Sequence, residues 1–135
     1  TIQPAPAVQP RAPRRFKVKG PLGVVESALG TGVEKRTPLG VSDVFASDVG
    51  KLWAFVKVKN RGAPVQLTMV WKREGKVRAK YTLRVGKSFG WRTWGTKRIR
   101  TRDAGRWTVE LLTPDGELLH TMRFQVKPAP KAPVI

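Results

Sequence analysis

The feature that most constrains the fold is an alternation of apolar and polar residues with a period of two, which recurs between residues 52 and 126. Successive side chains of a strand point to opposite faces of a sheet, so this alternation is typical of strands buried on one side. No stretch keeps a 3.6-residue apolar period over three turns, which argues against a helical fold. The pattern predicts strands over residues 24–29, 52–59, 65–72, 77–85, 89–99, 107–111 and 118–126.

Turn signals separate these strands. Arg73-Glu74-Gly75-Lys76 is typical of a hairpin, and Thr113-Pro114-Asp115-Gly116 has proline and glycine where a tight turn favours them. Short strands at a spacing of about 8–12 residues are typical of a sandwich or small barrel. With 135 residues the chain has room for one ordinary domain. We therefore predict an all-β fold, a single immunoglobulin-like antiparallel β-sandwich with extended Pro-rich termini.

Proline defines the expected domain boundaries. Eight of the eleven prolines lie in residues 1–21 and 127–135. Segments of this composition favour extended backbone and cannot build a core. We expect a Pro-rich basic arm or linker at 1–21, the sandwich at 22–126 and a Pro-rich tail at 127–135. The two ends are interpreted either as linkers or as arms that contact a partner, and the basic residues of the first are Arg11, Arg14, Arg15, Lys17 and Lys19.

Positive charge is concentrated in the middle of the chain. The 27 Lys and Arg residues outnumber the 9 Asp and Glu residues, which gives a net charge of +18, and residues 71–106 alone carry thirteen basic and two acidic residues. On the strand at 77–85 the residues Arg78, Lys80 and Arg84 share the phase expected to point away from the core, and they repel one another unless an anion lies between them. The alternative is an exposed sheet edge kept charged against aggregation. The predicted polyanion-binding residues are Lys72, Arg73, Lys76, Arg78, Lys80, Arg84, Arg92, Lys97, Arg98, Arg100 and Arg102.

The tryptophans fall into two groups. Trp71 and Trp107 lie on apolar phases and are expected in the core. Trp53, Trp91 and Trp94 are candidates for stacking on a base or a sugar ring, because an exposed indole beside arginine offers a platform for both. Trp91 and Trp94 are three residues apart, so a strand places them on opposite faces. The alternative for these residues is packing against an arginine stem or a neighbouring subunit.

The sequence offers little for catalysis or metal binding. It contains no cysteine and a single histidine, His120, which lies on the apolar phase of the last strand and is expected to be a satisfied core or rim residue. We predict no enzyme activity, no cofactor and no metal site. No apolar run approaches the roughly 20 residues of a membrane-spanning helix, so no transmembrane segment is expected.

Several segments together resemble a bacterial family of domains of unknown function, DUF2914. They are VGKLWAFVKV (49–58), LTMVWKREGK (67–76), WRTWGTKRI (91–99), GRWTVELLTPDGELL (105–119) and FQV (124–126). The sequence departs from the family pattern at Met69 and Val70, where many members have a histidine before the tryptophan, and at Gly95, where they have serine. The resemblance implies a small non-enzymatic β-domain, often attached to envelope or regulatory modules.

These features together predict a non-catalytic binding and assembly module. Its basic face is expected to engage an anionic polymer, either nucleic acid or acidic polysaccharide, or an acidic protein surface, with the arms making inter-subunit or partner contacts. The alternatives are a sequence-independent nucleic-acid-binding protein and a structural subunit of an envelope layer, sheath or filament. A homo-oligomer or larger assembly is also considered, and it would favour the structural subunit. A periplasmic, cell-surface or extracellular location is favoured over a cytoplasmic one.

Overall fold

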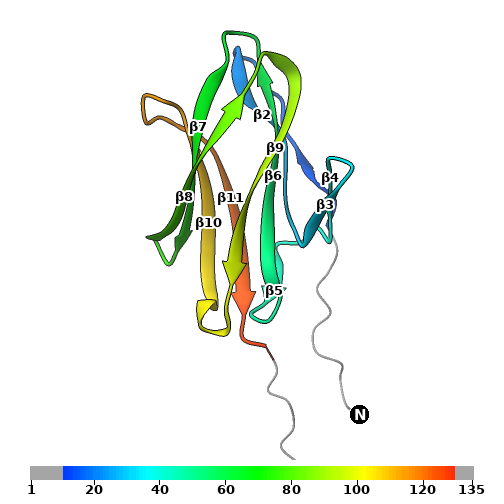
Figure 1. Ribbon diagram of the computed structural model, residues 1–135, viewed down its shortest axis with the longest axis vertical. Helices are drawn as coiled ribbons and strands as arrows, with labels where there is room; N and C mark the ends of the chain where they lie inside the picture. Colours follow the sequence, from blue (N-terminus) through cyan, green and yellow to red (C-terminus); the bar gives the residue numbers. More distant parts are fainter. Residues whose placement is uncertain (1–10, 130–135) are drawn as a thin grey trace, which may run out of the picture.

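The computed structural model describes residues 11–129, which form two packed β-sheets (Figure 1). One sheet has the strand order β1-β2-β6-β9, the other has the order β5-β11-β10-β7-β8, and β3 and β4 form a separate hairpin. The elements are β1 (Arg14–Arg15), β2 (Leu22–Gly30), β3 (Gly32–Glu34), β4 (Thr37–Leu39), β5 (Val44–Ala46), β6 (Gly50–Asn60), β7 (Val65–Arg73), β8 (Lys76–Val85), β9 (Ser88–Ile99), the 3₁₀ turn η1 (Thr101–Asp103), β10 (Gly105–Leu112) and β11 (Leu118–Lys127). The predicted all-β sandwich is confirmed.

All seven strands predicted from alternation are present. The four that the sequence did not predict, β1, β3, β4 and β5, have two or three residues each. Strands of that length contain too few side chains to display a period of two. One of them also corrects the expectation of a purely antiparallel sandwich: β5 pairs with β11 in parallel, with Val44 beside Gln125. The parallel pair arises because the chain leaves the four-stranded sheet after β2, runs along β11 and returns at β6.

The core lies between the two sheets and contains the predicted tryptophans. The rings of Trp71 and Trp107 have their centroids 5.9 and 5.8 Å from that of Phe124, and both indoles are almost fully buried. Opposite them β6 contributes a row of small and branched residues, including Leu52 and Val56. Trp107 Nε1 donates a hydrogen bond to Asp103 O at 2.8 Å, whereas Trp71 Nε1 has no partner within residues 11–129.

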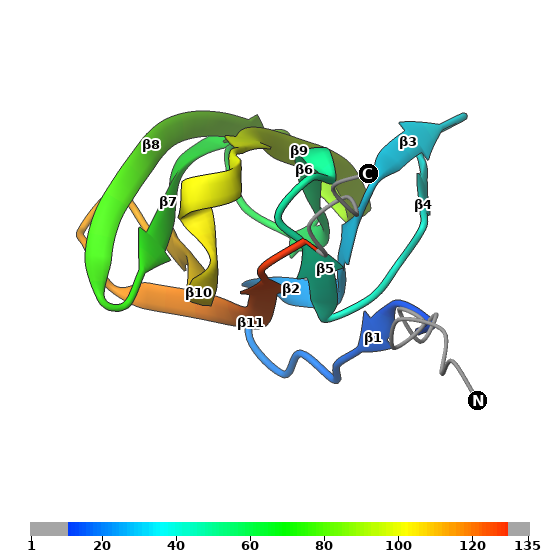
Figure 2. The same cartoon turned by 90° about the horizontal axis from the view of Figure 1, so that it is seen from below.

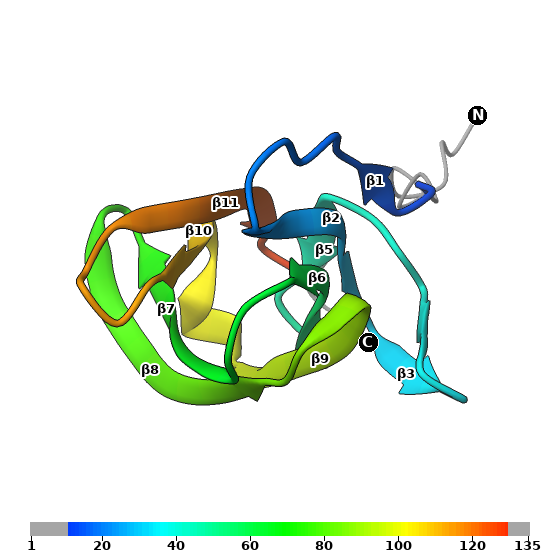
Figure 3. The ribbon, with the colours of Figure 1, turned by 90° about the horizontal axis from the view of Figure 1, so that it is seen from above.

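The strands at the sides of the sandwich are exposed in different degrees. Figures 2 and 3 show β8 next to β9 on one side and β11 next to β2 on the other. Strand β8 is the edge strand of the five-stranded sheet and pairs only with β7, so part of its inner face is exposed to solvent. Val77 and Tyr81 alternate with Arg78, Lys80 and Arg84 in the sequence and so fall on the phase expected to face the core, but they are 58% and 39% exposed. These two assignments were wrong, at Tyr81 because the strand is an edge and at Val77 because of a bulge described below.

Residues 11–21 of the basic arm lie against the sandwich. Arg14 and Arg15 form β1, which pairs with β2, and Phe16 packs its ring on His120 with centroids 4.7 Å apart. The guanidinium of Arg11 lies 3.1 Å from Asp43, which also accepts Arg14 at 3.6 Å. Residues 1–10 of the predicted arm and 130–135 of the predicted tail lie outside the described residues.

His120 joins the two sheets at the β11–β2 side. Its Nε2 lies 3.0 Å from Ser27 Oγ, and Phe16 covers the ring. Burial lowers the pKa of His120 below its ordinary value, because a buried imidazolium loses its hydration. The expected role as a satisfied rim residue is confirmed.

We therefore expect the protein to lose stability as the pH falls from about 7.5 to about 5.5. The imidazole of the unfolded chain binds a proton as the pH passes below about 6.5, whereas the folded protein resists that proton, so acid favours the unfolded state. His120→Gln keeps a polar partner for Ser27 and removes the titration. Urea unfolding of both proteins at the two pH values measures the effect. An equal loss of stability in the wild type and the variant would contradict this assignment.

Candidate polyanion-binding surface

The structure does not gather the eleven predicted cations on one surface. Their side chains divide among the outer face of the five-stranded sheet, the region of η1 and the outer face of the four-stranded sheet. The first set comprises Lys72, Lys80 and Arg84 with Lys76 at the hairpin turn, the second Arg73, Arg78, Arg100 and Arg102, and the third Arg92 and Arg98. Lys97 faces the side of the sandwich and donates from Nζ to Arg98 O at 2.9 Å.

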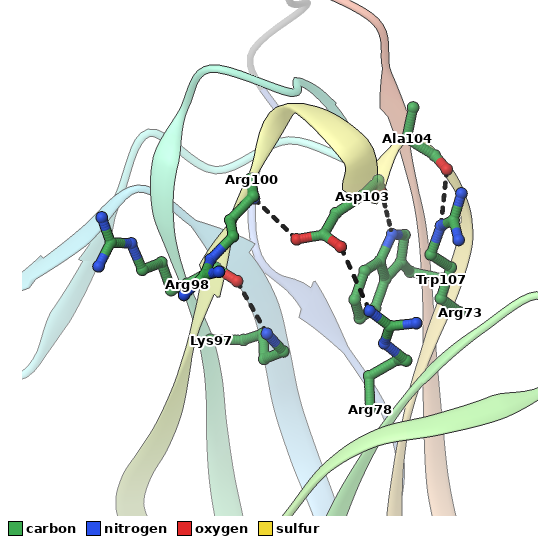
Figure 4. Close-up of polar contacts among 8 residues, drawn as sticks. All are labelled: Arg73, Arg78, Lys97, Arg98, Arg100, Asp103, Ala104 and Trp107. Carbon is green, nitrogen blue, oxygen red and sulfur yellow. Dashed lines mark hydrogen bonds and ion pairs between the residues drawn. The ribbon is translucent and has the colours of Figure 1, made fainter.

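Arg78 and Arg100 of the second set contact the buried carboxylate of Asp103 (Figure 4). Asp103 is 3% exposed, and its Oδ2 accepts a hydrogen bond of 2.8 Å from the backbone N–H of Arg100. Its Oδ1 lies 3.6 Å from Arg78 Nη2, and nearby Arg73 Nε donates to Ala104 O at 2.7 Å. A buried carboxylate requires such partners, because an unpaired one is strongly destabilising. Arg78 therefore stabilises the fold through Asp103, and Arg73 fixes the neighbouring carbonyl of Ala104.

A β-bulge explains why Arg78 does not point away from the core as predicted. Trp71 pairs with Ala79 and Lys72 with Val77, so Arg78 has no residue opposite it in the ladder. A bulge re-aims the side chains around it. Val77 consequently shares the outer face with Lys72 and is exposed, and Arg78 reaches Asp103.

The outer face of the five-stranded sheet keeps fewer free cations than expected. Lys72 Nζ lies 2.8 Å from Glu110 Oε1. Lys76, Lys80 and Arg84 are exposed and make no ion pair within the described part of the chain. In the arm, Arg15 lies 3.8 Å from Glu26, and the exposed Lys17 and Lys19 make no ion pair there either. Exposed cations of this kind contribute mainly to long-range attraction.

A basic and aromatic groove lies instead on the outer face of the four-stranded sheet. The register places Lys57 beside Arg92 and, one row along, Phe55 beside Trp94. The groove has a volume of about 640 Å³ and is open to solvent. It is lined by Arg36, Lys57, Ser88, Phe89, Gly90, Trp91, Arg92 and Trp94.

The charge in this groove is uncompensated. Its lining contains three cations, Arg36, Lys57 and Arg92, and no acidic side chain. None of the three makes an ion pair or a side-chain hydrogen bond to any residue between 11 and 129. The stem of Lys57 crosses β9 at Gly90, where a Cβ atom would overlap Lys57 Cε. The absence of a side chain at Gly90 therefore lets Lys57 lie in the groove.

The β3–β4 hairpin brings Arg36 to this face. Figures 2 and 3 show the hairpin projecting from the four-stranded sheet, away from β7 and β8. Its close approach depends on Gly30, since a Cβ atom there would lie 2.3 Å from Leu39 O. Lys35 and Arg36 form the turn in the left-handed conformation, with φ of 50° and 60°. The hairpin contacts β2 and β6, and Phe55 on this face is 1% exposed.

The three predicted stacking residues occupy different positions. Trp94 lies on the outer face, lines the groove and is 36% exposed. Trp91 lies on the opposite face of β9, where its six-membered ring packs over Gly86. It is 38% exposed and also lines the groove. Trp53 shares the face of Trp94 but lies outside the groove, with Lys51 Nζ 5.1 Å from its ring centre. The opposite orientations predicted for Trp91 and Trp94 are confirmed.

Sequence reasoning missed Arg36 and Lys57 as groove residues. Lys57 shares the phase of Trp53 and Phe55, so alternation alone could have placed it on the same face. Arg36 gave no such signal, because the hairpin that carries it has strands of only three residues.

Across residues 11–129 there is no group of three or more His, Cys, Asp or Glu side chains that could hold a metal ion. The same residues contain no helix with the length and apolar character needed to cross a membrane.

Reversing the charge at Arg78 tests the role of Asp103. We expect Arg78→Glu to lower the free energy of unfolding by about 2 kcal/mol, because it places a second carboxylate beside a buried one. The loss is smaller than for a fully buried pair, since Arg78 keeps contact with water. Lys80→Glu is the matched control on the same strand, expected to change stability by no more than about 0.5 kcal/mol. Equal stability of the two variants in urea unfolding would contradict the structural role of Arg78.

Comparison with known proteins gives one family match, in the second half of the chain. No curated protein matches the chain. Residues 64–126 match the sequence model of a family described as "Protein of unknown function (DUF2914)". This region contains β7 to β10 and nearly all of β11, so it includes Arg92 and Trp94 but neither Lys57 nor Arg36. The resemblance to the DUF2914 family that the sequence predicted is confirmed over residues 64–126.

Proposed function

We propose that this protein is a non-catalytic binding and assembly module whose basic surface engages an anionic polymer or an acidic partner. The binding site in this proposal is the groove of Arg36, Lys57, Arg92 and Trp94, which we call the basic groove. The observation that carries the proposal is the convergence of three unpaired cations beside a half-exposed indole.

Electrostatics supports this assignment. Like charges confined to one groove repel each other, and the repulsion is relieved when an anion binds among them. Some cations elsewhere in the chain, such as Arg78 and Lys72, already have acidic partners. The groove volume of about 640 Å³ suits a segment of a polymer or a small ligand. The remaining free cations increase the rate of association with a polyanion.

The strand order also supports an immunoglobulin-like assignment of the sandwich. Strands β2, β6 and β9 lie in one sheet, and β11, β10, β7 and β8 follow one another in the other. The division of strands between two sheets that are antiparallel apart from the β5–β11 pair, with the chain crossing repeatedly from one sheet to the other, resembles the immunoglobulin arrangement. We propose this subclass on that basis. In such a sandwich the faces of the sheets are available as binding surfaces.

Neutralising the basic groove tests the proposed function. We expect the triple variant R36Q/K57Q/R92Q to bind fluorescent dextran sulfate at least tenfold more weakly than the wild type at about 50 mM salt, because three direct charge contacts are lost. Binding is measured by fluorescence anisotropy.

The matched control is K76Q/K80Q/R84Q, which removes the same number of charges from the opposite sheet. Its exposed side chains have no ion pairs to lose, so the fold is retained. We expect it to weaken binding by only about two- to threefold, through the change in net charge. Equal losses in the two triple variants would mean that affinity depends on net charge alone and that the groove is not the site.

A further inference from the structure

We infer that the basic groove binds a uronic acid unit of an acidic polysaccharide. This inference rests on the proposed function and specifies the chemistry of its ligand. It is drawn from three features of the groove: the exposed indole of Trp94 on the outer face of the sheet, a pair of adjacent cations on neighbouring strands, and a third cation held by a separate hairpin.

Trp94 supplies the surface for a sugar ring. It lies on the face of a sheet with about a third of its surface exposed, and β6 places the buried Phe55 beside it. The face of an indole is electron-rich, so it attracts the C–H groups that line one side of a pyranose ring. A sheet face also holds the indole in place, which lowers the entropic cost of binding.

The cations recognise the carboxylate of such a sugar. Lys57 and Arg92 are direct neighbours across β6 and β9, one row from Phe55 and Trp94. An acid group carried by a ring that stacks on Trp94 therefore falls within reach of both. Arginine binds carboxylates in a bidentate manner, and Arg36 provides a second guanidinium from the hairpin. In the proposed complex the indole of Trp94 contacts the sugar ring, and the adjacent cations bind its carboxylate. A uronic acid carries both of these features.

A nucleic acid fits this arrangement less well. Proteins that bind single strands present several aromatic side chains to successive bases along a basic track. Here the groove is lined by the exposed aromatic side chains of Phe89, Trp91 and Trp94. Trp91 and Trp94 lie on opposite faces of β9, so these two indoles do not form one continuous surface for successive bases. Farther along β9, Lys97 is engaged with the backbone carbonyl of Arg98. Within residues 11–129 there is also no α-helix that could enter a major groove.

Isothermal titration at about 100 mM salt tests the inference with defined probes. The probes are hexamers of galacturonate and of hyaluronan, the methyl ester of the galacturonate hexamer, a single-stranded DNA 12-mer and poly-glutamate. We expect at least one of the uronate hexamers to bind at least tenfold more tightly than the methyl ester, the DNA and poly-glutamate. Trp94→Leu is expected to weaken that binding about tenfold. Trp53→Leu, which removes an indole of the same face outside the groove, is expected to leave it within about twofold.

The outcomes separate the inference from the proposed function. Binding of DNA or poly-glutamate at the groove with equal or higher affinity would overturn the uronate assignment and leave the proposed function intact. Equal affinity for the methyl ester would show that the carboxylate is not recognised. Uronate binding that is indifferent to Trp94→Leu, in a variant whose circular dichroism is unchanged, would also overturn the inference. Failure of every probe, dextran sulfate included, would overturn the proposed function with it.

Discussion

The contacts of the buried Asp103 hold together the end of β9, the start of β8 and the core residue Trp107. Its carboxylate lies buried where β8 begins and β9 ends, and it is bound by the backbone N–H of Arg100 and the guanidinium of Arg78. The carbonyl of the same residue accepts the indole N–H of the core residue Trp107. The η1 turn is thereby held against the core and against β8, the edge strand of the five-stranded sheet. A cation on β8 is a structural requirement for this arrangement, because the carboxylate cannot be buried alone.

The basic residues of the protein fall into two groups, those with an acidic partner and those without one. Cations such as Arg78 and Lys72 have acidic partners and stabilise the fold. The cations of the basic groove have none within the described residues, and their mutual repulsion is retained in the folded protein. Lys76, Lys80 and Arg84 of the basic hairpin are also unpaired within the described residues. The cations of the groove differ from them because they line one hollow together with Trp94, so binding is expected on the outer face of the four-stranded sheet.

Alternation predicted the long strands and the buried tryptophans, because a period of two survives wherever a strand is long and buried on one side. It failed at Val77 and Arg78, where a bulge shifts the phase by one residue without any change in the sequence pattern. It also missed the β3–β4 hairpin, whose position depends on the close approach allowed by Gly30. The groove combines residues far apart in the chain, Arg36 with Lys57 and Arg92, so the charge of one continuous segment could not reveal it.

The most direct test of the central claim is to follow the five tryptophan indole N–H signals by NMR during titration with an acidic oligosaccharide. We expect the Trp94 signal to shift most, the Trp91 signal to shift less because this residue faces the other side of β9, and the signals of the buried Trp71 and Trp107 to stay in place. Shifts confined to backbone amides of β8, with Trp94 unchanged, would place the binding site on the five-stranded sheet and contradict the account.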